Sequence, residues 1–218
     1  MVRRWWIGLV PVVAAGAVLA ARRRADRRAA PFDPDVVGRR ESEAWVAYYR
    51  REWLRMLVAV LGMVAAGFRM GPRDTVAGAW HVLRANQAWA PSDNDPDAAR
   101  RHMAVFYRLM VANGWELDPV RAAELEVEWW RVHRLHQHAE GPDADALTDA
   151  LDALYSEVHA IPAGQARVAA GLRMRAMEVS DRWVEAGADR GDPMLTQERA
   201  LLVASYAALR AATASRRA

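Results

Sequence analysis

The chain has 218 residues, of which 53% are hydrophobic and 26% are charged, a balance typical of a folded globular domain. It contains no Cys and no Lys, which excludes disulfides, cysteine-based zinc sites, thiol nucleophiles, Schiff-base lysines and the P-loop lysine. The net charge of +3 is unevenly distributed: residues 1–40 hold nine Arg against three Asp, a net of +6, which leaves −3 for residues 41–218. The later part lacks the basic excess of nucleic-acid-binding domains, so we expect no nucleic-acid partner.

The N-terminal segment predicts a membrane anchor. Residues 5–21 are uncharged and almost wholly apolar. As a helix they would span roughly 25 Å, which is the short end of a bilayer crossing. Trp5 and Trp6 stand where an interfacial aromatic anchor is usual. We therefore expect one transmembrane helix here, which makes the membrane the first expected partner.

Two other interpretations of this segment stay open, a cleaved signal peptide ending at residues 19–21 and a twin-arginine signal at Arg3 and Arg4. The five Arg between residues 22 and 28 would make a poor start for a mature chain, which favours an uncleaved, single-pass anchor in the cell membrane. By the positive-inside rule they place the folded domain in the cytoplasm. We expect residues 1–40 to form the anchor, an Arg-rich juxtamembrane segment and a linker at 30–38, and residues 41–218 to form the domain.

Every segment after Arg40 predicts helix, because no stretch alternates apolar and polar residues with the period of a strand. Asp-Pro pairs and Gly, Asn or Pro breaks mark the helix ends. Short connections between helices favour antiparallel neighbours. The expected fold is all-α, a compact bundle of about seven antiparallel helices. These span about 41–68, 73–90, 96–113, 119–141, 143–161, 163–187 and 193–213.

Four polar side chains fall on or beside apolar helix faces. His136 lies within the apolar arc of the helix 119–141, and His133 lies at its edge, on the same stripe as Glu126. Glu52 lies in the middle of an apolar stripe of the helix expected at 41–68. We expect His136 and Glu52 to be largely buried, where a charged group must be paired, protonated or bound to a cation.

Two hypotheses account for these residues. In the first, Glu52, Glu126, His133 and His136 meet in the core and bind a transition metal, with iron as the expected cofactor, since carboxylates and imidazoles on facing helices hold di-iron centres. In the second they form a structural hydrogen-bonded network, such as a Glu52–His136 pair. The spacing Glu126-x6-His133 is similar to that of one helix in haem-oxygenase-like di-iron oxidases. Those proteins also use an Asp-x3-His pair, which this chain lacks.

A broader resemblance involves two stretches, RANQAWAPSDNDPDAARRHMAVFY at 84–107 and LEVEWWRVHRLHQH at 125–138. Together they resemble an uncharacterised group of membrane-anchored helical proteins from high-GC bacteria. The resemblance implies an all-helical domain over most of the chain beyond residue 40. It implies no activity and no site residues.

These observations predict a membrane-anchored helical interaction or scaffold protein with a protein partner. The alternative is an iron-dependent helical-bundle oxidoreductase that uses the Glu/His site. No catalytic residues are predicted, because Ser180 and Ser205 lack the sequence context of a nucleophile elbow.

Overall fold

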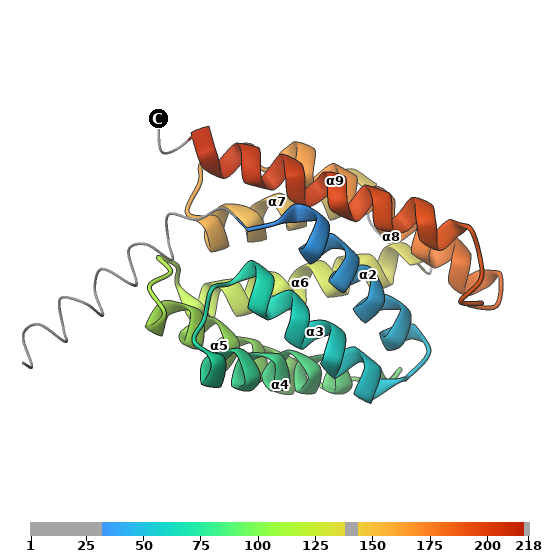
Figure 1. Ribbon diagram of the computed structural model, residues 1–218, viewed down its shortest axis with the longest axis horizontal. Helices are drawn as coiled ribbons and strands as arrows, with labels where there is room; N and C mark the ends of the chain where they lie inside the picture. The colour runs from blue at the N-terminus through green and yellow to red at the C-terminus, as the bar shows by residue number, and fades with distance from the viewer. Residues whose placement is uncertain (1–31, 138–143, 216–218) are drawn as a thin grey trace, which may run out of the picture. The chain divides into compact units, whose positions relative to one another are not determined.

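The computed structural model describes residues 32–137 and 144–215, and within these ranges the secondary structure is helical throughout, without strands (Figure 1). The all-α prediction is confirmed, with eight described helices rather than about seven. No helix in the described ranges is both long and apolar enough to cross a membrane. The helices are α2 (Pro34–Tyr49), α3 (Trp53–Gly67), α4 (Pro72–Trp89), α5 (Pro96–Ala112), α6 (Pro119–Gln137), α7 (Ala144–His159), α8 (Arg167–Glu185) and α9 (Met194–Ser215).

The start of the domain differs from the prediction. Helix α2 begins at Pro34, where the Asp33 side chain caps it by accepting the Asp35 N–H at 3.0 Å. The segment 30–38 therefore contains the start of a helix, and the prediction of a linker there is wrong from residue 34 onward. The anchor predicted at residues 5–21 lies outside the described residues.

The helix predicted at 41–68 is in fact two helices, separated at residues 50–52. Arg51 adopts a left-handed φ of 59°. The Glu52 N–H donates to the Ala47 carbonyl at 2.8 Å, and the Arg51 N–H donates to the Tyr48 carbonyl at 3.0 Å. This is the hydrogen-bond pattern of a Schellman C-cap, whose left-handed position is usually Gly. The sequence hides the break because Arg occupies that position.

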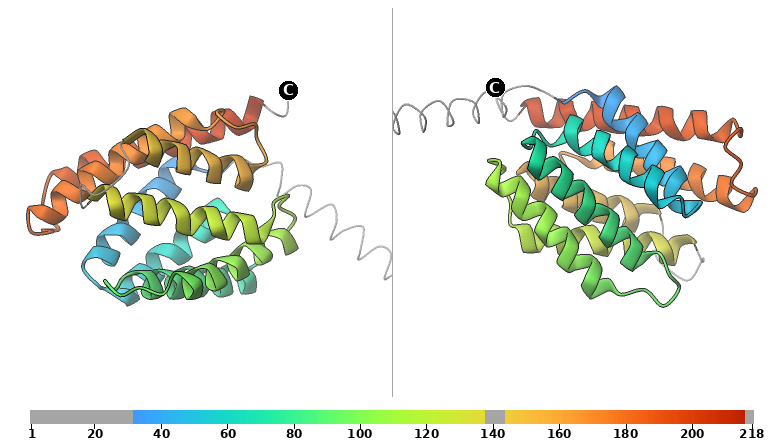
Figure 2. Two further views of the ribbon diagram at one scale, coloured as in Figure 1. Left: turned by 180° about the vertical axis from the view of Figure 1, so that it is seen from behind. Right: turned by 60° about the horizontal axis from the view of Figure 1, so that its bottom comes forward.

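The helices form a closed antiparallel ring. Each packs against the next in the chain, and α9 packs against α2 to close the circle (Figures 1 and 2). At the α2–α9 contact, Gly38 lies so close to Val203 that a Cβ on Gly38 would be 2.8 Å from the Val203 Cα. Gly38 therefore sets the separation of the two helices that close the ring.

The antiparallel order sorts the helix ends into two groups. The C-terminal ends of α2, α4, α6 and α8 lie at one end of the ring, with the N-terminal ends of α3, α5, α7 and α9. We call this the pocket end. Phe32 belongs to the opposite end, where its ring meets the Tyr206 ring edge-on with centroids 6.0 Å apart. All the described residues belong to one compact unit, Phe32–Ala218.

Candidate functional site

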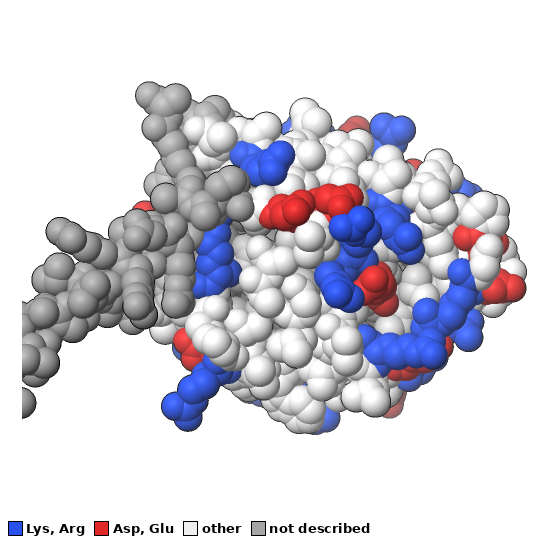
Figure 3. All heavy atoms as spheres, viewed as in Figure 1, with Lys and Arg blue, Asp and Glu red and all other residues white. Residues whose placement is uncertain are grey.

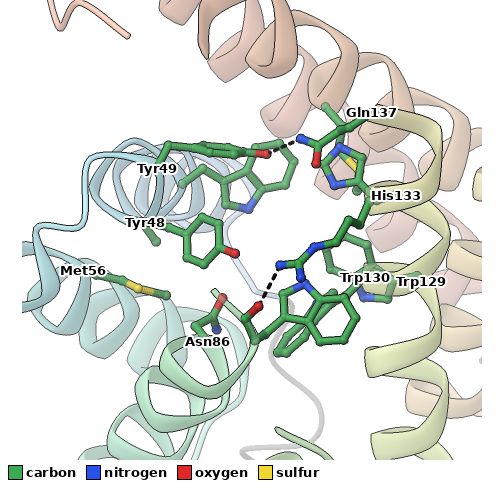
Figure 4. A pocket seen from close by; sticks show the side chains of 13 residues that line it. Tyr48, Tyr49, Met56, Asn86, Trp129, Trp130, His133 and Gln137 are labelled. Atoms are coloured by element: carbon green, nitrogen blue, oxygen red, sulfur yellow. Dashed lines mark hydrogen bonds between the residues drawn. The ribbon is translucent and has the colours of Figure 1, made fainter. Parts of the chain in front are cut away.

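A pocket lies inside the pocket end of the ring, among α2, α3, α4, α6 and α8 (Figure 4). Its cavity volume is about 100 Å³. This is smaller than the engineered apolar cavity of about 150 Å³ that binds benzene, so the space suits part of a small ring or a branched alkyl group. We call it the aromatic pocket; its lining residues are Ala44, Trp45, Tyr48, Tyr49, Met56, Asn86, Trp89, Trp129, Trp130, His133, Arg134, Gln137 and Met177.

Six of the thirteen lining residues of the pocket are Trp or Tyr. Trp130 packs against Trp89 with ring centroids 5.9 Å apart and edge-on against Trp129 at 6.1 Å. Tyr48 and Tyr49 also meet edge-on, at 5.3 Å. Edge-to-face contacts are a preferred geometry for aromatic pairs, and together with the tilted Trp89–Trp130 contact they hold the rings in fixed orientations. The wall is therefore preformed for an apolar or aromatic group.

Arg134 crosses one side of the pocket from α6 to the end of α4. Its guanidinium carbon lies 4.5 Å from the centroid of the Trp89 ring. Its two NH groups donate to the carbonyls of Trp89 at 2.7 Å and of Pro91 at 3.2 Å. A cation at these terminal carbonyls also compensates the negative end of the α4 dipole. The cation is thus fixed in place, with its flat face against the aromatic wall.

A second polar group borders the pocket at α8. The Asp181 carboxylate accepts from Gln137 at 2.6 Å and from the Tyr49 hydroxyl at 3.4 Å. The His133 Nε2 lies 3.1 Å from its other oxygen. Burial raises the pKa of Tyr49, and the Asp181 charge raises it further, so this hydroxyl stays a donor. Figure 4 shows Gln137 and Tyr49 joined at the pocket rim.

Arg173 supports the aromatic wall from the inside of the ring. Its guanidinium carbon lies 5.1 Å from the ring centroid of Trp129 and 5.6 Å from that of Trp45. It forms a buried ion pair with Glu41 and donates to the Tyr155 hydroxyl at 3.1 Å. The two tryptophans therefore lie between this buried cation and the cavity, which limits how far they can move.

The four residues proposed as metal ligands have different surroundings. Glu52 is at the N-cap of α3, where its side chain is 26% exposed. Arg50, Arg55 and Arg190 bind its carboxylate. Hydrogen bonding from Arg50, and then from Arg190, lowers the pKa of Glu52 to about 2. The prediction that Glu52 is a largely buried residue on an apolar stripe is therefore wrong.

Glu126 and His133 lie inside the bundle but bind different partners. Glu126 accepts from the Tyr107 hydroxyl at 2.7 Å and from the Trp130 Nε1 at 3.2 Å, and burial raises its pKa. His133 faces Asp181 at the pocket rim, and His136 is partly buried in the last turn of α6. Over residues 32–137 and 144–215, no group of three or more His, Asp or Glu side chains is placed to hold a metal ion. The iron hypothesis gains no support from the described part of the chain.

Sequence reasoning did not identify Glu41, Arg173 or Asp181. On α8 the apolar side chain of Val168 faces outward and is 71% exposed. The buried stripe includes Ala169, Ala170, Arg173, Ala176 and Met177. The available signal was the set of small residues one turn from Arg173, which leave room for a large side chain to lie inside the ring.

Comparison with protein-family models, with curated proteins and with solved structures finds no match for this chain.

Proposed function

We propose that this protein is a membrane-anchored helical binding module that holds an aromatic or apolar group of its ligand in the aromatic pocket. The ligand-binding part of this proposal rests on the preformed cavity of about 100 Å³, which has six aromatic side chains in its lining. Concave apolar sites with a few fixed polar groups are the usual form of ligand sites. The same chemistry accepts a ring of a small molecule or an aromatic side chain of a protein partner.

The polar groups of the pocket indicate where a polar substituent of the ligand would lie. Arg134 and Asp181 hold opposite charges at different sides of the rim, and both are already tied to protein partners. A neutral ligand with one hydroxyl or amide therefore fits better than a fully charged one, because neither fixed charge has to be released. His133 and Gln137 supply hydrogen-bonding groups beside Asp181.

The anchoring part of the proposal rests on sequence. The apolar run at 5–21 and the Arg cluster at 22–28 are the features of an uncleaved anchor with its domain in the cytoplasm. Attachment to a membrane confines a binding module to one surface. That arrangement suits an interaction or scaffold role.

Binding is tested with small neutral probes: indole, 4-methylphenol and, as an aliphatic comparison, n-butanol. A ligand that binds only the folded state raises the melting temperature with concentration. We expect indole and 4-methylphenol to raise it more than butanol does, with saturable heats in calorimetric titration. Ala44→Leu places an isobutyl group in the cavity and should abolish the response, whereas Met177→Leu keeps the lining volume and should preserve it. No response of the wild-type protein to either aromatic probe would refute the pocket's role.

A further inference from the structure

A second feature lies on the outer surface of α3 and α4 and takes no part in the aromatic pocket. Three apolar side chains on one side of α3 are exposed: Leu54 at 76%, Val58 at 58% and Leu61 at 36%. Val76 and Trp80, one turn apart on the neighbouring α4, are exposed at 59% and 50%. We call these five residues the α3–α4 face. Single exposed apolar residues are ordinary, but a contiguous set on two packed helices is typical of a binding surface.

The charges around the α3–α4 face are mostly positive. Arg55 on α3, and Arg73 and Arg84 on α4, are all exposed. The two helices contain one acid, Asp74, whose carboxylate accepts a hydrogen bond from Asn113 at 2.7 Å. Glu52, which Arg55 contacts, is shared with two further arginines, so that cluster is also net positive. Figure 3 shows this side of the molecule, largely white over α3 and α4 with arginine and some acidic side chains at the margins.

The segment between the predicted anchor and α2 is short. This step rests on the anchor in the proposed function. Residues 22–33 join the apolar run to α2, and twelve residues can span at most about 40 Å. Gly67 at the end of α3 packs against Val37 in the first turn of α2. With that anchor in place, the segment limits how far α2 can lie from the bilayer, and α2 packs against α3.

We infer that the α3–α4 face binds the surface of an anionic bilayer. Its apolar side chains enter the boundary between headgroups and acyl chains, and the arginines lie among the lipid phosphates. Trp80 suits this position because its ring is amphipathic, and Arg side chains place apolar stems in the boundary while their charged ends stay in water. Amphipathic helices bind membranes in this way, by apolar burial together with attraction to anionic lipids.

The absence of Cys makes a direct test possible in the full-length chain. Three single-cysteine variants are labelled with bimane: Val58→Cys on the face, Val168→Cys on α8 as the matched exposed control, and Val13→Cys in the apolar run. Each is reconstituted into vesicles of phosphatidylglycerol and phosphatidylcholine in equal parts, with brominated acyl chains as quencher. We expect the labels at positions 58 and 13 to lose most of their fluorescence and the label at 168 to lose little.

The three labels separate the possible failures. Quenching at 13 without quenching at 58 would refute membrane binding by the α3–α4 face but would still support the anchor. No quenching at 13 overturns the anchor, and quenching at 58 then still supports the face. Quenching at 58 should fall several-fold in pure phosphatidylcholine or at high salt, because the attraction to anionic lipid is screened. Two results together would assign the face to a second copy of the chain instead. The label at 58 would be shielded from solvent already without lipid, and the unlabelled variant would form disulfide-linked dimers.

Discussion

Glu198 is a buried carboxyl whose neutral form is favoured by its surroundings. Its side chain has no exposure, and the Ser42 hydroxyl donates to its Oε2 at 2.8 Å. Its Oε1 has no hydrogen-bond partner among the described residues. Burial raises the pKa of Glu198 from its ordinary 4.5 to about 7. The folded state therefore keeps this proton over a pH range in which the unfolded chain has lost it.

The raised pKa predicts that Glu198 alone contributes a loss of stability as the pH rises from about 4.5 to about 7. In that window this carboxyl is protonated more in the folded state than in the unfolded state, so its contribution to the free energy of unfolding falls with pH. The contribution of this group is on the order of 3 kcal/mol. Glu198→Gln keeps the shape without the titration and should remove this loss from the pH dependence of stability. Urea unfolding at a series of pH values measures both proteins, and parallel curves would contradict the assignment to Glu198.

Glu52 shows how a residue-level prediction can fail for a reason that lies in the backbone. The prediction assumed one continuous helix, which put Glu52 on the same stripe as Tyr49 and Met56. The left-handed turn at Arg51 resets the helical phase, so the side chains before and after it no longer share a face. The residue then lies at the surface, where three arginines surround it. No helical wheel predicts such a break when Arg stands where Gly is usual.

Helix starts were more predictable than helix ends. Helices α5 and α6 begin at the prolines that the sequence indicated, and Asp95 and Asp118 accept the N–H groups of Ala98 and Val120 at 2.8 Å. These signals are local, because an Asp followed by Pro both caps a helix and fixes its first turn. The end of α7 uses Ala160 with a φ of 50°, again a left-handed residue that is not Gly. Such ends are set by packing and leave little trace in the sequence.

Two glycines predict opposite effects of the same substitution. Gly38→Ala places a methyl group 2.8 Å from the backbone of Val203, which forces α2 and α9 apart and should cost about 1–3 kcal/mol. Gly171→Ala in α8 meets nothing within 4 Å and should stabilise the helix by up to about 1 kcal/mol. Thermal or urea unfolding of the two variants measures the difference. Equal stability of both variants would mean that α2 and α9 separate without cost.

At the scale of the whole molecule, Arg173 connects four of the eight described helices. From α8 it pairs with Glu41 on α2, donates to Tyr155 on α7 and lies over Trp129 on α6. These contacts join residues that are distant in sequence. The aromatic pocket was unpredictable for the same reason: its tryptophans were visible in the sequence, but the ring closure that gathers them was not.

Removing one partner of the buried Glu41–Arg173 pair should be far more damaging than removing both. Arg173→Met leaves the Glu41 charge buried and unpaired, which should cost on the order of 3–5 kcal/mol. Adding Glu41→Leu removes that charge, and apolar replacements of buried pairs are often close to neutral. Urea unfolding of wild type, Arg173→Met and the double variant measures the recovery. A double variant no more stable than Arg173→Met would show that the damage is lost packing against the tryptophans rather than an unpaired charge.

The closed antiparallel ring has an even number of described helices. The start of the domain and the aromatic pocket lie at opposite ends of this ring. Phe32 and the second half of α9 meet at one end, whereas the aromatic pocket lies at the other, beside the turns at 50–52, 90–95 and 186–193. Insertions or substitutions in those turns can reshape the rim of the pocket without disturbing the point where the chain enters the ring. Under the proposed function, changes at a single end of the ring could alter the preference for a ligand and leave the start of the domain unchanged.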